Sequence, residues 1–556
     1  MEKPTPTAAT PRSKDPLLKS GPETPTLNAV PPRKDPLFES IMDHFELHYT
    51  RGGQAYVTHK QDDRGEIIPL QSKKFSQLLH HHLYIHTGKV PQRSVVNGMV
   101  QLMEIKALEG RKVSVCTRIG SVGDSIYTDS AGEYGQHVKM SPETVEIVPA
   151  RGSAAKFLSR PGSLPLVNPD LQGDLSRLFQ FLNVEDPDHQ KLVIAWLVMS
   201  LNPSGPYPIL TVQGEQGTGK SCLCRFLRDL VDPAEPYLEN FPRTEHELLI
   251  SARHGHILAY DNISGVNDSM SDALCRISTG SGLRIRKLYT DIDEVRLSAK
   301  KPILLNGIAD LFSRQDVCDR SITVRMARIS PADRVPEREL NQRWEQEKPG
   351  ILGGLYRAVA MALRNLDGVQ LDSYPRMADF ARFIVAAEPA LPWAAGDFLQ
   401  AYERNRQAII DDAIEADPVA SAITRLLDYY PAGWRSSPSD LLAILNQIVS
   451  DDIRHLRTWP KMANQLSAKL NRCVTFLRAR NIVIDSGHKV AGQRVISVQR
   501  LVPPQPVLSG SASAPALDNQ PIPVQSIPVQ AQVPADGPQP EQPDTCWQYP
   551  SDDVQA

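Results

Sequence analysis

The chain has 556 residues, of which 41% are apolar, and a formal net charge of −3. This is enough for about three ordinary domains. With so small a net charge, the protein as a whole does not attract nucleic acid, and any basic surface that binds it must be local. The longest apolar run, residues 192–201, is about half a membrane span, and the proline-rich N-terminus does not resemble a signal peptide. We therefore expect a cytoplasmic protein with no membrane partner.

Residues 1–36 are rich in proline and poor in large apolar side chains, so we expect them to be disordered. Residues 37–150 predict a small α/β domain of unknown role. Its expected strands are residues 55–59, 66–70, 112–119, 125–129 and 145–149, and its expected helices are residues 72–88 and 94–108.

The first of these helices carries His80, His81, His82 and His86. Neighbouring helical positions point in different directions, so only His82 and His86 share a face. We therefore interpret the segment as a partly exposed basic helix and not as a metal site. A primase role would need its own catalytic metal site, and the adjacent Asp62 and Asp63 lack a convincing carboxylate partner.

Residues 174–330 alternate predicted helices with near-continuous apolar strands at residues 208–213, 256–261 and 301–307. Such strands with helices between them predict a buried parallel sheet.

The sequence GEQGTGKS, from Gly214 to Ser221, lies between the first of these strands and a predicted helix. Glycines permit positive φ and close backbone approach. A loop of this kind wraps its N–H groups around phosphates at the start of a helix. Lys220 would reach the β- and γ-phosphates, and Ser221 would be a ligand of Mg²⁺. The expected ATP-binding residues are Gly214, Glu215, Gln216, Gly217, Thr218, Gly219, Lys220, Ser221 and Cys222.

Asp261 ends the second strand and would deliver a carboxylate to Mg²⁺ or to its water. The next residue is Asn262, where many ATPases have a glutamate that polarises the attacking water. An asparagine cannot accept that proton. Either the base comes from elsewhere, or Asp261 has both roles, or hydrolysis is slow.

Asn306 ends the third strand, where it could contact the γ-phosphate or the lytic water, or be a plain polar strand end. Arg314 and Arg320 follow, and either could reach the nucleotide of a neighbouring subunit as an arginine finger. The alternative is a surface salt bridge with a residue such as Asp316. We prefer Arg320 as the finger.

The segment between Asp261 and Asn306 reads SDALCRISTGSGLRIRKLYTDIDEVRLSAKKPILLNGI. It predicts a helix, a glycine turn, a basic strand, a turn and a second strand, and therefore a β-hairpin before the strand of Asn306. This order resembles superfamily 3 helicases, the AAA+ ring helicases of viruses, phages and plasmids. Over most of residues 40–500 the chain more closely resembles uncharacterised ATP-binding proteins of phages and integrative elements.

The resemblance implies a homo-oligomeric ring, such as a hexamer, with ATP between subunits and hairpins that grip single-stranded DNA in the channel. By position, Arg284, Arg286 and Lys287 match the basic side of the hairpin. The predicted turn carries Asp291 and Asp293, which would repel phosphate. Either the basic strand faces DNA, or the loop serves subunit contacts.

Residues 331–415 predict a helical region. Residues 416–500 predict the element order of a winged helix, which would bind duplex or junction DNA. Residues 453–500 contain ten lysines and arginines against one acidic residue, Asp485. We expect phosphate contacts from Lys461, Lys469 and Arg472, and from Lys489 in the wing. A winged helix that docks protein is the alternative. The proline-rich residues 501–556 are expected to be disordered.

The fold class is therefore α/β: an AAA+ P-loop core with a small N-terminal α/β domain, a helical region and a C-terminal winged helix. The expected function is an enzyme, an ATP- and Mg²⁺-dependent DNA helicase or translocase that acts in replication of a mobile genetic element. The alternative is a nucleotide-switched initiator or loader that hydrolyses weakly and does not unwind DNA. A small-molecule P-loop kinase is disfavoured, because that chemistry has no use for the hairpin and the basic module.

Overall fold

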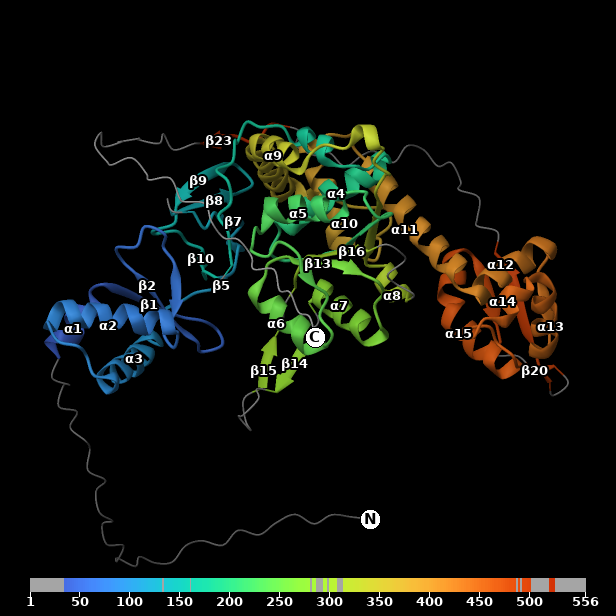
Figure 1. Cartoon of the computed structure of the whole chain (residues 1–556), viewed down its shortest axis with the longest axis horizontal. Helices are drawn as coiled ribbons and strands as arrows, with labels where there is room; N and C mark the ends of the chain where they lie inside the picture. The colour runs from blue at the N-terminus through green and yellow to red at the C-terminus, as the bar shows by residue number, and fades with distance from the viewer. Residues whose placement is uncertain are drawn as a thin grey trace, which may run out of the picture.

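The computed structural model describes residues 35–132, 135–160, 162–280, 283–286, 294–297, 300–307, 314–486, 489–490, 493–501 and 520–525. Figure 1 shows an N-terminal unit in blue and a C-terminal unit in orange on opposite sides of a central sheet covered by helices. No helix among these described residues is long and apolar enough to span a membrane.

The N-terminal unit is a small sheet covered by helices. Helix α2 begins after Ser72, whose hydroxyl accepts a hydrogen bond from the Phe75 N–H, and ends at Gly88 with φ of 66°. Its buried side chains, among them Phe75 and Leu79, pack into the core of this unit. The sheet order is β3-β2-β1-β4. The elements are α1 (Pro36–Met42), β1 (Phe45–Tyr49), β2 (Ala55–His59), β3 (Ile67–Pro69), α2 (Lys73–Thr87), α3 (Arg93–Ala107) and β4 (Arg111–Lys112).

A second sheet follows, in the order β23-β9-β8-β7-β6. Its apolar side chains, such as Met140 and Val145, belong to the core of the central part and not to that of the N-terminal unit. The sequence predicts one domain over residues 37–150, whereas the structure divides these residues between two hydrophobic cores. The strands are β6 (Ile119–Val122), β7 (Ser125–Asp129), β8 (Gln136–Met140), β9 (Val145–Pro149) and β23 (Val524–Gln525), and a short parallel pair joins β5 (Val115–Cys116) to β10 (Lys156–Phe157).

Strand β23 comes from the C-terminal tail. Val524 pairs in parallel with Val145, and Ile522 is buried. The expectation that the whole tail lacks structure is therefore wrong for residues 520–525. Two apolar residues separated by one proline, Ile522 and Val524, are enough to complete a sheet edge that already exists. So short a pattern carries little signal in a proline-rich segment.

The central sheet has five parallel strands in the order β12-β13-β16-β11-β17. The strands are β11 (Ile209–Gln213), β12 (Glu239–Asn240), β13 (Leu258–Ile263), β16 (Ile303–Gly307) and β17 (Ser321–Arg325). Val212 lies opposite Asn306 on one side and Val324 on the other. The predicted buried parallel sheet is confirmed, and the carboxyl ends of its strands share one edge.

Helices cover both faces of this sheet, which explains why its strands are apolar throughout. Leu210 and Leu304 pack into the core that contains α4, α5, α9 and α10, whereas Ile209 and Ile303 pack into the core that contains α6 and α7. The helices are α4 (Pro187–Ser200), α5 (Lys220–Val231), α6 (Glu245–His254), α7 (Asp268–Thr279), α9 (Glu337–Asn365) and α10 (Ala378–Ala387).

Strands β14 (Leu283–Arg286) and β15 (Glu294–Leu297) form an antiparallel pair in which Leu283 lies opposite Leu297. The predicted β-hairpin is thus confirmed for its strands. Its acidic turn lies outside the described residues.

Helix α11 (Asp397–Ala416) joins the central part to the C-terminal unit. Phe398 near its start packs into the central core, and Ile410 near its end packs into the C-terminal core.

In the C-terminal unit β18, β22 and β19 form an antiparallel sheet against three longer helices. The sequence does not predict the short helix α14. The elements are α12 (Pro418–Tyr429), β18 (Trp434–Ser436), α13 (Pro438–Ile448), α14 (Asp451–His455), α15 (Ala463–Ala479), β19 (Ile482–Asp485), β20 (Lys489–Val490), β21 (Gln493–Arg494) and β22 (Ile496–Arg500).

Candidate functional site

The glycine-rich loop, residues 214–219, connects β11 to α5 at the carboxyl edge of the central sheet. We call it the phosphate loop, after the function that its sequence predicts. Gly217 and Gly219 have φ of 82° and 84°, which favour glycine, and Gly219 immediately precedes the helix. A Cβ on Gly214 would lie 2.9 Å from the Thr218 hydroxyl and 3.3 Å from the Met326 Cβ. The loop is therefore compact, and the N-terminus of α5 faces the space that it encloses.

Lys220 is the first residue of α5, and its side chain turns back over the loop. Its Nζ donates hydrogen bonds to the carbonyl oxygens of Gly214 at 2.8 Å and Glu215 at 2.7 Å. Both acceptors belong to the loop, so the ammonium group is held at the place where a phosphate would lie. A positive charge beside backbone N–H groups at a helix N-terminus makes this a site for an anion.

Three side chains from three separate motifs meet beside this lysine. The Ser221 hydroxyl donates to Asp261 Oδ1 at 3.2 Å, and Asn306 Nδ2 donates to the same Asp261 oxygen at 2.6 Å and to Ser221 Oγ at 3.1 Å. They meet because β16, which carries Asn306, lies between β11 and β13. The structure thus brings together the serine, aspartate and asparagine that the sequence predicts for one site.

The burial of Asn306 shows why this contact is specific. Asn306 is only 1% exposed, whereas Ser221 is exposed and Asp261 is half-buried. A buried amide must find hydrogen-bond partners, and Asn306 finds them in the two oxygens nearest the loop. Its amide thus has two side-chain partners, one on α5 and one on β13.

The donor set fits a small divalent cation. Mg²⁺ prefers oxygen ligands at about 2.0 to 2.1 Å in an octahedron, so that neighbouring ligand oxygens lie roughly 2.9 Å apart. The hydroxyl and the carboxylate oxygen of Ser221 and Asp261 lie 3.2 Å apart beside the phosphate loop. These two residues could hold Mg²⁺ together with the oxygens of a bound phosphate chain.

Asn262, directly after Asp261, has φ of 54°, a left-handed conformation that is uncommon for a residue other than glycine. Its backbone N–H donates to Asp261 Oδ1 at 2.8 Å, and its side chain is exposed. The strained backbone therefore helps to orient the aspartate, while the amide side chain offers no general base.

Sequence reasoning missed Asn183. Its Nδ2 donates to the carbonyl oxygens of Thr218 at 3.1 Å and Ala327 at 2.6 Å. It ties the phosphate loop to the segment that follows β17, where Met326 and Ile329 face Gly219. Asn183 lies in the run FLNVEDP, which matches no motif, so only the fold reveals its position.

Arg320, the preferred candidate for an arginine finger, is not at this edge. Arg320 directly precedes β17, and its carbonyl oxygen accepts from the N–H of Ile209, the first residue of β11. Arg320 is therefore at the amino edge of the sheet, where its guanidinium donates to the Asp316 carbonyl oxygen. Arg314 forms ion pairs with Asp272 at 2.8 Å and Asp316 at 3.2 Å. Within one chain, neither arginine reaches the phosphate loop.

The predicted DNA contacts are described in part. Arg284 and Arg286 lie on β14 and Lys489 lies on β20, but their side chains, and all of Lys287, lie outside the described residues. Lys461 comes just before α15 and is exposed. In that helix Lys469 is half-buried and Arg472 is exposed.

The charges of the C-terminal unit are partly compensated. Arg454, Arg480 and Arg500 form ion pairs with Asp451, Asp411 and Asp428. By contrast, no described carboxylate lies within 4 Å of the charged groups of Lys461, Lys469 and Arg472. The uncompensated positive charge therefore includes the three residues that the sequence singles out around α15.

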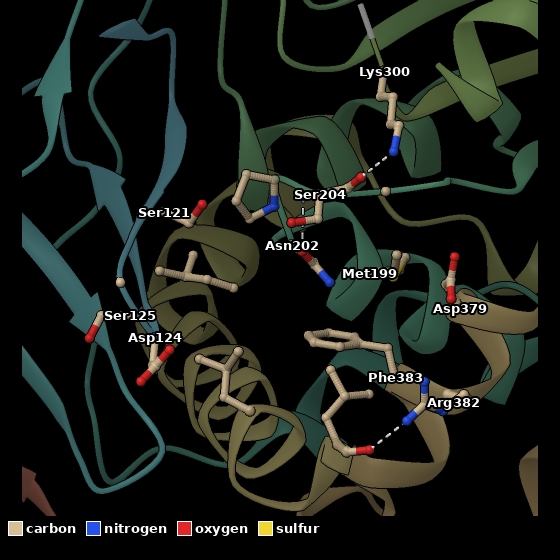
Figure 2. A pocket seen from close by; sticks show the side chains of 16 residues that line it. Ser121, Asp124, Ser125, Met199, Asn202, Ser204, Lys300, Asp379, Arg382 and Phe383 are labelled. Atoms are coloured by element: carbon tan, nitrogen blue, oxygen red, sulfur yellow. Dashed lines mark hydrogen bonds between the residues drawn. The ribbon is translucent and has the colours of Figure 1, made fainter. Parts of the chain in front are cut away.

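A cavity of about 450 Å³ lies elsewhere, at the amino edge of the sheet, and is shown in Figure 2. Lys300 Nζ donates to the Ser204 carbonyl oxygen at 2.9 Å on one side, and Arg382 donates to the Leu366 carbonyl oxygen at 3.0 Å on the other. Lys300 precedes β16 whereas Asn306 is near its end, so this cavity is separate from the phosphate loop.

Comparison with known proteins agrees on a role in replication. The family described as actinomycete integrative conjugative element replication protein matches residues 175–412, and the AICE RepA C-terminal domain matches residues 419–512. The first match contains the phosphate loop, Asp261 and Asn306, and the second contains α15. No curated protein matches the chain.

Among solved structures the chain is similar to the C-terminal region of NrS-1. Its A-form apo structure is 12% identical, covers 84% of this chain and 99% of that chain, and has a TM-score of 0.41. An apo structure of residues 305–718 of NrS-1 is 13% identical, covers 83% of this chain and 98% of that chain, and has a TM-score of 0.39.

The two family matches together span more than half of the sequence, and the chain belongs to the replication proteins of actinomycete integrative conjugative elements.

Proposed function

We propose that this replication protein is a Mg²⁺-dependent P-loop ATPase of the AAA+ type that moves along or unwinds DNA as a homo-oligomeric ring. The observation that carries the proposal is the meeting of Ser221, Asp261 and Asn306 beside Lys220 at the carboxyl edge of the sheet. In open parallel sheets, ligands bind at this edge.

Each residue of this group has a distinct role in the proposal. The loop N–H groups and Lys220 hold the phosphates of ATP, and Ser221 and Asp261 hold Mg²⁺, which neutralises the charge of the phosphates when it is bound. Asn306 fixes the orientation of Asp261. When Ser221 turns to Mg²⁺, the N–H that Asn306 donates to the Ser221 hydroxyl becomes available for the γ-phosphate or the attacking water. Because Asn262 cannot act as a base, we expect a slow basal rate of ATP hydrolysis.

The proposed ring would give Arg320 a role in the reaction. Arg320 lies at the amino edge of the sheet, so it does not contact a nucleotide bound to its own subunit. In a ring, the surface of one subunit would face the nucleotide of the next subunit. We propose Arg320, with Arg314 as the alternative, for the stabilisation of charge on the transferred phosphoryl group across that interface.

DNA contacts are proposed at two places. The element order of residues 418–500, with α15 as the third long helix and the β20–β21 hairpin as the wing, supports a winged helix that binds duplex or junction DNA through Lys461, Lys469, Arg472 and Lys489. The β14–β15 hairpin, through Arg284, Arg286 and Lys287, is proposed to contact single-stranded DNA in the ring channel.

A second function, a nucleotide-switched initiator or loader, is favoured by Asn262. A site that binds ATP tightly and hydrolyses it slowly can hold an assembled state without driving movement. In that case ATP would control binding of the protein to DNA, and strand separation would be left to another protein.

A strand-displacement assay on a forked duplex distinguishes the two. Wild-type protein and Lys220→Ala are compared with ATP and with a non-hydrolysable analogue. Displacement that needs ATP hydrolysis and Lys220 supports the helicase. Tight DNA binding in ATP without displacement supports the loader, and the absence of any effect of ATP contradicts both.

A further inference from the structure

Four histidines gather at one end of the N-terminal unit, far along the sequence from the phosphate loop. His44 lies between α1 and β1, His59 ends β2, and His82 and His86 lie on α2. Their rings are neighbours: the centroids of His44 and His82 are 4.9 Å apart, those of His44 and His86 are 5.5 Å apart, and those of His59 and His82 are 5.1 Å apart.

The ring nitrogens face one another. His59 Nε2 lies 3.1 Å from His82 Nε2, and His86 Nε2 lies 3.3 Å from His44 Nε2. One ring nitrogen from each of His44, His59 and His82 lies within 4.8 Å of the other two. Two imidazole nitrogens bound to one tetrahedral Zn²⁺ at about 2.0 to 2.1 Å are roughly 3.3 Å apart. The two close pairs already have this spacing.

The ring nitrogens have no carboxylate partner that would compete with a metal. Among the described residues, no carboxylate oxygen forms an ion pair with His44, His59, His82 or His86 within 4 Å.

The cluster also has an apolar floor. Phe45 is buried, and its ring contacts His59 and His82 edge-on at centroid distances of 5.4 and 5.2 Å. Phe45 lies opposite His59 across the β1–β2 pair. An apolar layer of this kind limits the access of water and holds the ligands in place.

We propose that His44, His59 and His82 form a binding site for a divalent zinc ion, and that His86, whose Nε2 lies 3.3 Å from that of His44, moves toward the other rings to become the fourth ligand. All-imidazole sets suit zinc and similar transition metals. The ion would join the α1–β1 corner, the end of β2 and the middle of α2, and so has a structural role in this unit. It is independent of the ATPase, which uses oxygen ligands and lies in another part of the chain.

One contact must change when the metal binds. The Gln61 N–H donates to His59 Nδ1 at 3.3 Å, which leaves the proton of a neutral ring on Nε2. Zinc binding through Nε2 moves that proton to Nδ1, so the exposed turn at Gln61 has to shift away. Without metal, the same close pairs are satisfied by N–H···N hydrogen bonds between neutral rings.

The test uses the full chain, stripped of metal with a chelator and then dialysed against a small excess of ZnSO₄. Bound zinc is measured by plasma mass spectrometry. We expect one zinc ion per chain, and loss of at least about 90% of it in His44→Ala, His59→Ala and His82→Ala, because each variant removes a ligand. His81→Ala is the matched control, since His81 is exposed and adjacent to His82 on the same helix.

Substitution with Co²⁺ gives a second readout, because a four-coordinate site shows intense visible absorption bands and an octahedral, adventitious ion does not. The three variants come from three different elements, and circular dichroism reports whether each is folded. Less than one tenth of a zinc ion per wild-type chain, or full zinc retention in folded His59→Ala and His82→Ala, would show that the rings only bind one another and would overturn the proposal.

Discussion

Asn306 donates a hydrogen bond to Asp261, with Nδ2 and Oδ1 2.6 Å apart, although 45 positions separate the two residues in the chain. The contact exists because β16 lies between the strand that leads into the phosphate loop and the strand that ends near Asp261. Asn306 is only 1% exposed, so its amide is bonded to Asp261 and Ser221 and not to solvent.

Replacing the amide by a carboxylate tests this relationship with little change of volume. In Asn306→Asp, the new carboxylate lies beside that of Asp261 and the two negative charges repel each other. The hydrogen bond to Asp261 is lost. We expect kcat for ATP hydrolysis to fall by about 10²-fold, the usual effect of removing one preorganised donor, and the thermal unfolding temperature to fall as well, because a second carboxylate is then buried beside Asp261. Unchanged hydrolysis in a folded Asn306→Asp would remove Asn306 from the proposed site.

Asn262 provides a gain-of-function test. Asn262→Glu places a carboxylate next to Asp261, where a general base is otherwise missing. We expect basal ATP hydrolysis to rise by about 10-fold or more, since general-base catalysis contributes at least this much. Asn262→Gln, which has the same side-chain length but no carboxylate, is the control and should leave the rate unchanged. A rate that does not rise in Asn262→Glu would mean that the base comes from another residue.

Asp232, at the end of α5, anchors the phosphate-loop helix to the second sheet. It is fully buried, and its Oδ1 accepts from Arg118 at 3.1 Å and from Arg160 at 2.5 Å. Burial alone would raise the pKa of Asp232, but the guanidinium groups of Arg160 and Arg118 outweigh it and hold the pKa well below its ordinary range. Asp232→Asn leaves these two buried cations without their partner, and we expect a loss of about 3 to 5 kcal/mol in the free energy of unfolding.

The pH dependence of this effect has a definite sign. The folded-state pKa of Asp232 lies below its unfolded value, which is about 4, so its stabilisation is complete above about pH 4 and is lost as the pH falls further. The difference in unfolding temperature between wild type and Asp232→Asn should therefore be constant from pH 7 to pH 5 and shrink below about pH 4. A difference that grows on acidification would contradict this assignment.

The basic surface at α15 predicts a salt-dependent DNA affinity. Each lysine or arginine that contacts a phosphate contributes roughly 0.9 to the slope of log affinity against log salt concentration. In the triple variant Lys461→Ala, Lys469→Ala, Arg472→Ala we expect the slope, measured by fluorescence anisotropy with duplex DNA, to decrease by about 2 to 3. Arg480→Ala is the control, because Arg480 is already paired with Asp411. An unchanged slope would favour a module that docks protein.

Local sequence patterns predict that Ser221, Asp261 and Asn306 lie together, and the structure places them in contact. Gly214 to Ser221 could be recognised because glycine spacing and a following helix are properties of one short segment, and the apolar runs before Asp261 and Asn306 predicted their strands. Asn183 and the histidine cluster could not be found in this way. Asn183 acts through the fold alone, and His44 and His59 join His82 only after β1 and β2 pair. The sequence also placed residues 119–149 in the wrong unit, because a strand pattern does not reveal which core the strand joins.

The measurement that tests the account most directly is steady-state ATP hydrolysis by the purified full chain, with and without single-stranded DNA, with Lys220→Ala as the control. We predict slow basal hydrolysis that needs Mg²⁺, rises severalfold with DNA and disappears in Lys220→Ala. No hydrolysis above the level of Lys220→Ala, with or without DNA, would contradict a DNA-dependent ATPase and leave the phosphate loop at most a nucleotide-binding switch.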